Sequence, residues 1–365
     1  MKDADLHIVL GAVQEPVLLV DRFQRIVHGN APALEMFGPD LEGKTFVRVL
    51  RQPAALKCLS QVVDGKARAE ADLIIQGEQS VQSLPYKMTA VHLGSDDPAI
   101  AITFKDVSAL VQAAQMRSDF VANVSHELRS PLTTLSGMIE TLMGNARDDP
   151  EAQQRFLKIM EREASRMDRL IGDLLSLSRV EADERIRPTD SVDLVEIIFN
   201  VLASMRERAE GEDRTLAFEP AAERCIVSGK ADELTQVFQN LIENSVKYSK
   251  PGGLVEVRVE WQRTAPRFLT PVWAISVRDE GEGIAPEHIP RLQERFYRVD
   301  SGRSRQMGGT GLGLAIVKHI LNRHRGRLNI ESQLGAGTTM TVLLPASLQH
   351  APSVLRGEFD QEPVR

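Results

Sequence analysis

The chain has 365 residues, which is enough for two or three domains of ordinary size. An apolar fraction of 42% and a charged fraction of 26% are typical of a soluble globular protein, and a formal net charge of −7 argues against general nucleic-acid binding. Cys58 and Cys225 lie far apart without metal-ligand spacing, which predicts buried thiols in a reducing compartment. The apolar run at residues 8–20 is interrupted and too short to cross a bilayer, so we expect neither a signal peptide nor a transmembrane helix.

Residues 1–107 mix short apolar runs with turn signals. Runs at 17–21 and 99–104 predict strands, and residues 31–37 predict a short helix. The pattern favours an α+β domain without a catalytic cluster. Its histidines lack the spacing of metal or haem ligands, so no metal or haem is assigned to them; they are His7, His28 and His92.

Residues 108–183 carry long helical periodicity with a single break. The break at residues 144–150 supplies a turn, with Asp148 or Asp149 as the N-cap of a second helix and Pro150 in its first turn. Each half has an apolar seam like that of a coiled coil. The seam residues are Val121, Val124, Leu128, Leu135, Ile139 and Leu142 in the first half and Phe156, Met160, Glu163, Met167, Leu170, Leu174 and Leu177 in the second.

These two seams predict an antiparallel helical hairpin. A hairpin of this kind buries little apolar surface alone, and pairing two copies into a four-helix bundle would cover both seams. We therefore expect a homodimer.

Residues 190–347 have a mixed pattern, which predicts an α/β sandwich. Helices are expected at 194–209, 232–248 and 312–323, and strands at 255–260, 272–277, 328–331 and 338–344. A linker at 184–190 contains Pro188, and the polar tail at 348–365 is expected to be disordered. The fold class of the whole chain is therefore multidomain α+β.

A distinctive motif, Ser-His-Glu-Leu-Arg-Ser-Pro-Leu, occupies residues 125–132. At 100° per residue His126 points away from the seam residue Leu128, which predicts a solvent-facing imidazole. A neutral imidazole is nucleophilic near neutral pH, and the Glu127 carboxylate can accept the other ring N–H. Pro131 removes a helical hydrogen bond, which predicts a bend or a loosened turn.

A polar stripe follows one face of the predicted helix at 232–248. It contains Glu233, Gln236, Asn240, Asn244 and Lys247. Taken alone, such a stripe is usually a solvated face. Asparagine is a poor helix former, however, and its amide oxygen is a hard ligand that suits Mg²⁺. Lys247, one turn further on, can neutralise phosphate charge.

Two later segments add nucleotide-binding chemistry. Asp279 follows a strand and could accept a hydrogen bond from an adenine amino group, while Gly281 and Gly283 let the backbone approach the base. Alone, this segment would be an ordinary turn. The loop at 308–313 precedes a helix, as phosphate-binding loops do. Its spacing is GxGxG and it does not follow a strand, so a dinucleotide-binding fingerprint is excluded.

Residues 125–132 resemble the H-box of bacterial two-component sensor histidine kinases, with Ser130 where the family usually has threonine. This resemblance implies that His126 accepts a phosphoryl group, with Glu127 beside it. The hydroxyl of Ser130 would support dephosphorylation of a partner. The catalytic residues implied are His126, Glu127 and Ser130.

The later segments, taken together and in order, resemble the four boxes of the Bergerat-fold ATP site, which histidine kinases share with gyrase, Hsp90 and MutL. The resemblance implies ATP and Mg²⁺ as cofactors, with Asn244 as the metal ligand. The ATPase branch usually has glutamate where Asn240 stands, which favours a kinase over a hydrolase. The implied cofactor-binding residues are Asn240, Asn244, Lys247, Tyr248, Asp279, Gly281, Gly283, Ile284, Phe296, Gly309, Thr310, Gly311, Leu312, Gly313 and Leu314.

Residues 1–107 loosely resemble a PAS domain, and residues 309–324 are similar to phosphate-responsive kinases of the PhoR type. The expected domains are a PAS-like sensor at 1–107, a dimerisation and phosphotransfer hairpin at 108–183 and a catalytic ATP-binding domain at 190–347.

The resemblance implies a cytoplasmic sensor kinase, either free or as part of a membrane-anchored protein. It would phosphorylate His126, pass the phosphoryl group to a response-regulator aspartate and dephosphorylate that regulator, with phosphate as a candidate signal. Its partners would be a second copy and a receiver domain, without nucleic acid. Two alternatives remain open: a Bergerat-fold ATPase, and a non-catalytic PAS and helical dimerisation module.

Overall fold

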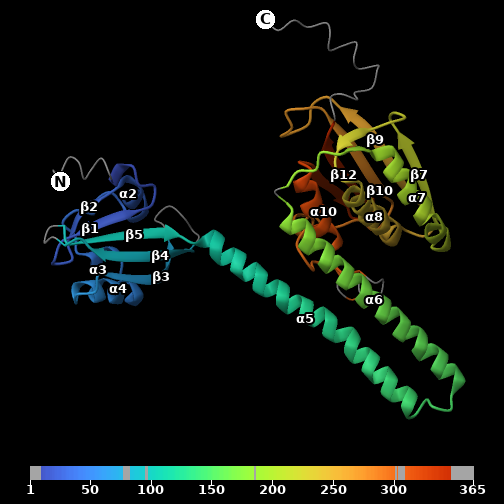
Figure 1. The fold of residues 1–365 in the computed structure, drawn as a ribbon, viewed down its shortest axis with the longest axis horizontal. Coiled ribbons are helices and arrows are strands. Elements are labelled where there is room, and N and C mark those ends of the chain that lie inside the picture. The colour runs from blue at the N-terminus through green and yellow to red at the C-terminus, as the bar shows by residue number, and fades with distance from the viewer. Residues whose placement is uncertain are drawn as a thin grey trace, which may run out of the picture. The chain divides into compact units, whose positions relative to one another are not determined.

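The computed structural model describes residues 10–76, 83–94, 98–184, 186–300, 302 and 309–346. His7, Gly308 and the tail at 348–365 therefore lie outside the described residues. Two compact units divide between residues 122 and 123. Figure 1 shows the ribbon of both.

The first unit is built on a five-stranded antiparallel sheet with the order β2-β1-β5-β4-β3. Buried Leu18, Phe46 and Phe104 contribute to one core between the sheet and the helices. The strands predicted at 17–21 and 99–104 and the helix at 31–37 are confirmed. The elements are β1 (Val17–Val20), β2 (Ile26–Gly29), α2 (Ala31–Phe37), α3 (Phe46–Val49), α4 (Pro53–Val63), β3 (Arg68–Gln76), β4 (Ser83–His92) and β5 (Ile100–Asp106).

The hairpin consists of α5 (Ser108–Met143) and α6 (Pro150–Ala182). Residues 108–122 of α5 belong to the first unit. The predicted turn is confirmed: the Asp149 side chain accepts a hydrogen bond from Ala152 N at 3.0 Å and caps α6, with Pro150 as its first residue. Helix α5 continues through Pro131, so the proline does not end it. Leu170 and Leu177 of the predicted seam are buried.

The C-terminal lobe of the second unit has a five-stranded sheet with the order β11-β12-β10-β9-β7, in which β7 runs parallel to β9. Helix α8 packs on β9 and β10 and contacts both α7 and α10. The predicted helices and strands are confirmed, and β6, β7 and β8 are additional. The elements are β6 (Ser191–Asp193), α7 (Leu194–Gly211), β7 (Arg214–Pro220), β8 (Ile226–Ser228), α8 (Ala231–Tyr248), β9 (Gly253–Gln262), β10 (Val272–Asp279), a 3-10 turn η1 (Ile289–Arg291), α10 (Gly313–Arg323), β11 (Arg327–Gln333) and β12 (Gly337–Pro345).

The pairing of β10 with β12 defines the two ends of this sheet. Asp279 pairs with Thr338 at one end, and Val272 pairs with Pro345 at the other. None of the helices in the described part of the chain combines the length and apolarity that a membrane crossing requires.

Candidate functional site

His126 lies on the exposed surface of α5, as its position relative to the seam predicts. The neighbouring Glu127 side chain is only 11% exposed. Its Oε2 accepts hydrogen bonds from Arg166 of α6 at 2.8 Å and from Arg298 of the C-terminal lobe at 3.1 Å. Glu127 therefore joins the histidine motif to a residue far along the chain, a contact that the sequence did not predict.

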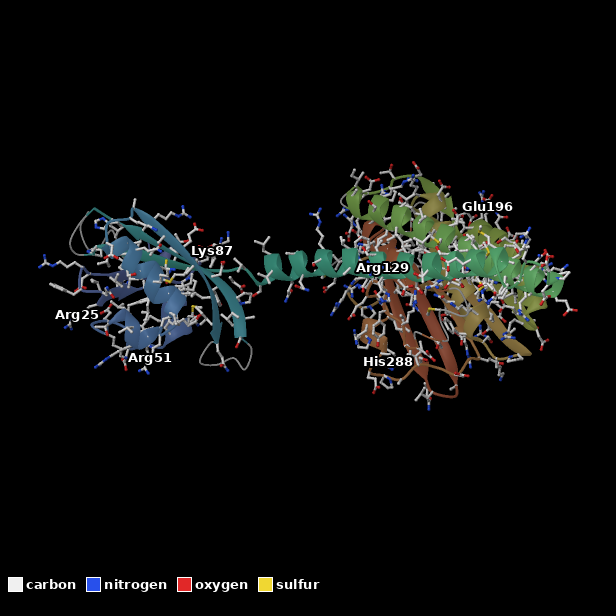
Figure 2. All side chains as sticks on the ribbon, turned by 90° about the horizontal axis from the view of Figure 1, so that it is seen from below. Arg25, Arg51, Lys87, Arg129, Glu196 and His288 are labelled. Atoms are coloured by element: carbon white, nitrogen blue, oxygen red, sulfur yellow. The ribbon has the colours of Figure 1, made fainter. Side chains whose placement is uncertain are left out.

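The helix after His126 is reinforced by side chains. Thr133 and Thr134 donate their hydroxyl hydrogens to the carbonyls of Arg129 and Ser130, at 2.9 and 3.2 Å. Figure 2 labels Arg129 on α5, and Ser130 is exposed beside it. These bonds occupy carbonyls close to Pro131, where the helical hydrogen-bond ladder is interrupted. The bend expected at the proline stays a prediction.

A cavity of about 520 Å³ opens in the second unit among α8, the end of β10, the loops after it and α6. It brings together most of the cofactor-binding residues expected from the sequence. Those that line it are Asn240, Asn244, Lys247, Tyr248, Asp279, Gly281, Gly283, Ile284, Gly309, Thr310, Gly311, Gly313 and Leu314. Phe296 and Leu312 do not line it: Leu312 is fully buried as the N-cap of α10, and the Phe296 backbone N–H donates to the Gly311 carbonyl at 2.8 Å.

Glycine is required where the cavity wall is made of closely approaching backbone. A Cβ at Gly281 would lie 2.3 Å from the Tyr248 carbonyl oxygen, and a Cβ at Gly283 would lie 2.0 Å from that of Gln333. Gly283 and Gly311 also have positive φ angles of 71° and 76°. The glycines predicted to admit a ligand are therefore also needed to build the wall itself.

Asp279 presents a buried carboxylate to the cavity, with 3% of the residue exposed. Its Oδ1 accepts a hydrogen bond from the Gly281 backbone N–H at 2.9 Å. Burial raises the pKa of this carboxyl above its ordinary value, against the effect of its hydrogen bonds. A buried acceptor in a cavity of this size suits the amino group of a purine base.

Arg298 is a cavity residue that the sequence analysis did not select. Its side chain is 6% exposed, and Nη2 donates both to Glu127 and, at 2.7 Å, to the Thr310 carbonyl. Its Nε is buried without a hydrogen-bond partner among the described residues. A buried guanidinium N–H beside a glycine-rich loop is a donor that an anionic phosphate would satisfy. The sequence signal that could have identified Arg298 is its position directly after the aromatic pair Phe296 and Tyr297.

Helix α6 also contributes to this cavity. Asp173 Oδ2 accepts from the Thr310 hydroxyl at 2.6 Å, and the Ser176 hydroxyl donates to Gln236 Oε1 at 2.7 Å. Burial raises the pKa of Asp173, against the Thr310 hydrogen bond. Nothing in the sequence marked Asp173, because the residue it meets lies more than a hundred positions away.

Tyr297 and Glu233 differ in whether they line the cavity. Tyr297 lines the cavity, and its hydroxyl lies 2.7 Å from Nδ1 of His288, which is labelled in Figure 2. Glu233, assigned to the polar stripe of α8, does not line the cavity. It is buried and pairs with Arg323 of α10. Of the stripe, the residues from Gln236 onward line the cavity.

Among the described residues, no group of three or more His, Cys, Asp or Glu side chains is arranged to hold a metal. An ion here would take an amide oxygen such as that of Asn244, with phosphate oxygens and water as its other ligands. Mg²⁺ prefers few protein ligands, so the cavity suits it when a nucleotide is bound.

Family comparisons agree with this arrangement. Residues 229–348 match the model described as "Histidine kinase-, DNA gyrase B-, and HSP90-like ATPase". Residues 116–183 match "His Kinase A (phospho-acceptor) domain", and residues 4–70 match "PAS domain". ATP binding is thus a property of the matched C-terminal family.

Curated relatives extend the match along the chain. The phosphate regulon sensor protein PhoR of Pseudomonas aeruginosa is 43% identical over 258 residues, which are 68% of this chain and 54% of that relative. A sensor protein kinase WalK of Staphylococcus aureus is 33% identical over 349 residues, which are 94% of this chain and 81% of that relative. The chain spans about half the length of PhoR and of other WalK relatives it matches, 54% and 55%.

A solved structure shares the fold over almost the whole chain. The histidine kinase ThkA, in complex with the response regulator protein TrrA, aligns with a TM-score of 0.51 at 19% identity and covers 94% of this chain and 99% of that one. The three family matches, the WalK relative and the assembled cavity agree: the chain belongs to the family of sensor histidine kinases.

Proposed function

We propose that this chain transfers the terminal phosphoryl group of ATP–Mg²⁺ to His126 and then to an aspartate of a response regulator. The observation that carries the proposal is the position of Arg298, which bonds both to Glu127, next to His126, and to the Thr310 carbonyl of the nucleotide loop. One side chain therefore contacts both the phosphoacceptor motif and the loop expected to hold the phosphates.

Each residue has a definite part in this proposal. ATP–Mg²⁺ supplies the phosphoryl group, with the metal neutralising its charge. His126 is the nucleophile, and Glu127 favours the charge that develops on its ring. Asn244 holds the metal, and Lys247 and Arg298 meet the phosphates. Placement and charge neutralisation supply most of the acceleration.

Adenine and the phosphates are held by separate groups. Asp279 accepts from the adenine amino group, while the backbone N–H groups at the start of α10 face the phosphates. Leu312 caps α10 without a side-chain hydrogen bond, so the first N–H groups of the helix are not taken up by its cap.

Kinase activity is favoured over ATP hydrolysis by the absence of a placed base on α8. Asn240 lines the cavity, and its amide cannot take a proton from water. Glu243 also lines the cavity, but its Oε1 accepts from Arg208 Nη1 at 2.7 Å. An ion-paired carboxylate is a weak general base.

We infer that two copies pair through the hairpin. Apolar side chains on α5 and α6 are exposed in the single chain, among them Leu132 at 56% and Leu175 at 55%. Such surface favours a four-helix bundle. The proposed domains are the sensor at 1–107, the hairpin at 108–183 and the ATP-binding domain at 190–347.

A second activity is proposed from Ser130, one helical turn after His126 and exposed. Its hydroxyl could orient water for removal of the phosphoryl group from the regulator.

The name of the relative PhoR favours phosphate as the signal. The structure of ThkA was solved with a response regulator, which favours the same class of partner for this chain. Use of ATP and two free, buried cysteines fit a cytoplasmic location.

Incubation with γ-labelled ATP and Mg²⁺ separates the three candidate functions. The proposal predicts an acid-labile, base-stable label on the protein that is lost in both His126→Ala and Asn244→Ala. Sustained phosphate release without label would favour an ATPase, and neither label nor release would favour a dimerisation module. Circular dichroism of both variants distinguishes loss of activity from loss of fold.

A further inference from the structure

A second concavity lies at the opposite end of the C-terminal sheet. It has a volume of about 800 Å³ and is formed by the loop between β9 and β10, the C-terminal part of α10 and the start of β11. Pro345 lines it, whereas the nucleotide cavity is lined by Asp279 and Thr338. The seven residue steps along β10 between these ends correspond to about 23 Å. The two concavities share no lining residue and are separate, although their walls adjoin at Leu292 and Gln293 and at Asn329 and Ile330.

The charged side chains that line this groove are all basic. Its basic lining residues are Arg267, Lys318, Arg325 and Arg327, and none of its lining residues in the described part of the chain is acidic. These four side chains make no ion pair with any described residue. The nucleotide cavity, by contrast, is lined by both arginines and carboxylates. Four cations around one concavity, in a chain whose net charge is −7, favour an anionic ligand.

Two of these arginines occupy backbone positions that favour glycine. Phe268 N donates to the Ala265 carbonyl at 3.0 Å, closing a turn with Pro266 in its second position and Arg267 in its third. The φ angle of Arg267 is 69°, as a type II turn requires at that position. Glycine is the residue that such a turn ordinarily takes.

Arg325 repeats this pattern at the end of α10. Gly326 N donates to the Leu321 carbonyl at 2.7 Å and Arg325 N to that of Asn322 at 3.0 Å, which is a Schellman motif with Arg325 in the left-handed position. Its φ angle is 54°. The fold alone would be better served by glycine at both positions, so the guanidinium groups are not explained by folding.

We propose that this groove binds a phosphate-bearing anion, either a soluble phosphate ester or a phospholipid headgroup. Three of the four cations are arginines, whose planar forks match phosphate oxygens. The volume is within the range of small-molecule sites, which favours a compact ligand over an extended acidic peptide. Phe268 and the fully exposed Leu269 provide an apolar wall that a lipid or an ester could contact.

The backbone geometry provides a variant that removes charge without harming the fold. The double variant R267G/R325G deletes two cations and places glycine where the backbone prefers it, so its melting temperature should be unchanged or higher. R267K/R325K keeps the charge. Gln24→Gly, at a residue with φ of 62° in the first unit, is the matched control for relief of backbone strain.

Pyrophosphate binding is measured by calorimetry on the full chain, with ADP saturating the nucleotide cavity. Sedimentation with phosphatidylcholine vesicles, with and without phosphatidylglycerol, is the second arm. We expect R267G/R325G to weaken binding by about tenfold or more and Gln24→Gly to bind like the parent, while R267K/R325K, which keeps the charge but not the forks, should bind with an affinity between the two. Binding of pyrophosphate alone identifies a soluble ester, and binding only to phosphatidylglycerol vesicles identifies a headgroup.

The proposal is overturned if the parent binds neither probe, if R267G/R325G binds as tightly as the parent, or if only a polyglutamate peptide binds. Autophosphorylation of R267G/R325G, measured in parallel, should match the parent because neither Arg267 nor Arg325 lines the nucleotide cavity. Its loss would bear on the kinase function and not on the groove, so the two hypotheses fail separately.

Discussion

Arg298 is the residue on which the proposed chemistry most depends. It is almost fully buried, bonds to Glu127 and to the Thr310 carbonyl, and keeps Nε without a described partner. A buried guanidinium is costly unless its donors are used, and a bound phosphate would use the remaining one. Its two bonds also link the nucleotide loop to the residue beside His126.

Replacing Arg298 by glutamine should lower kcat/KM for ATP in autophosphorylation by roughly tenfold to a hundredfold, because a charge-assisted hydrogen bond is lost. Arg298→Lys should recover only part of the rate, since an ammonium cannot reproduce the fork. Initial rates of labelling across ATP concentrations provide the measurement. Unchanged kinetics in Arg298→Gln would remove this residue from the mechanism.

The buried carboxyl of Asp279 should make nucleotide affinity depend on pH. Burial raises the pKa of this carboxyl. In the proposed role the ionised carboxylate is the stronger acceptor for the adenine amino group, so nucleotide affinity should fall as pH decreases through that raised pKa. The contribution of Asp279 to stability has the opposite sign: it is full below the unfolded pKa and is lost as pH rises through the folded one.

Titration of ADP binding against pH tests this. The parent should bind ADP progressively more weakly towards acidic pH. Asp279→Asn should bind weakly, by about tenfold or more, and its affinity should depend less on pH. A parent profile with the same shape as that of Asp279→Asn would exclude Asp279 as the titrating acceptor.

At the scale of elements, the loop after β10 is shaped by close contact between backbones. Gly283 combines a positive φ with a Cβ position 2.0 Å from the Gln333 carbonyl oxygen, whereas Gly335 has a positive φ of 80° and open space around it. Comparing substitutions at these two glycines therefore separates the cost of an unfavourable φ angle from the cost of a steric clash.

Gly283→Ala should reduce the free energy of unfolding by roughly 2 to 4 kcal/mol, since it adds overpacking to an unfavourable φ. Gly335→Ala should cost about 1 kcal/mol, because only the backbone conformation is strained. Urea unfolding followed by circular dichroism measures both. Equal losses in the two variants would mean that the close contact with Gln333 is unimportant.

Some elements of the fold could be predicted from the sequence, and others could not. Helices α6, α8 and α10 were predicted because their apolar spacing and the Asp149–Pro150 start are local signals. Strand β7 was not, because its stability comes from parallel pairing with β9, which leaves no local pattern. The resemblance supplied the cavity residues, but Arg298, Asp173 and the burial of Glu233 follow from contacts between distant segments.

At the scale of the whole molecule, the hairpin is the part that a single chain leaves incomplete. Leu170 and Leu177 are buried, while Leu132, Ile139 and Leu175 remain exposed on the same pair of helices. The second copy that we propose would cover such residues and place two copies of His126 in one bundle.

Ile139→Glu should convert the dimer to a monomer at micromolar concentration and raise the dimer dissociation constant by about a hundredfold or more, because it would bury a charge. Phe199→Glu, at an apolar residue of α7 that is 62% exposed, is the matched control and should remain dimeric. Sedimentation velocity distinguishes these outcomes. A dimer that persists in Ile139→Glu would place the interface elsewhere.

The most direct test of the account is to locate the phosphoryl group itself. The full chain is incubated with ATP and Mg²⁺, digested at neutral to alkaline pH and sequenced by tandem mass spectrometry under conditions that preserve phosphohistidine. We expect one modified residue, His126, and no modification in Asn244→Ala. A phosphoryl group on Ser130, Thr133 or another histidine, with His126 unmodified, would contradict it.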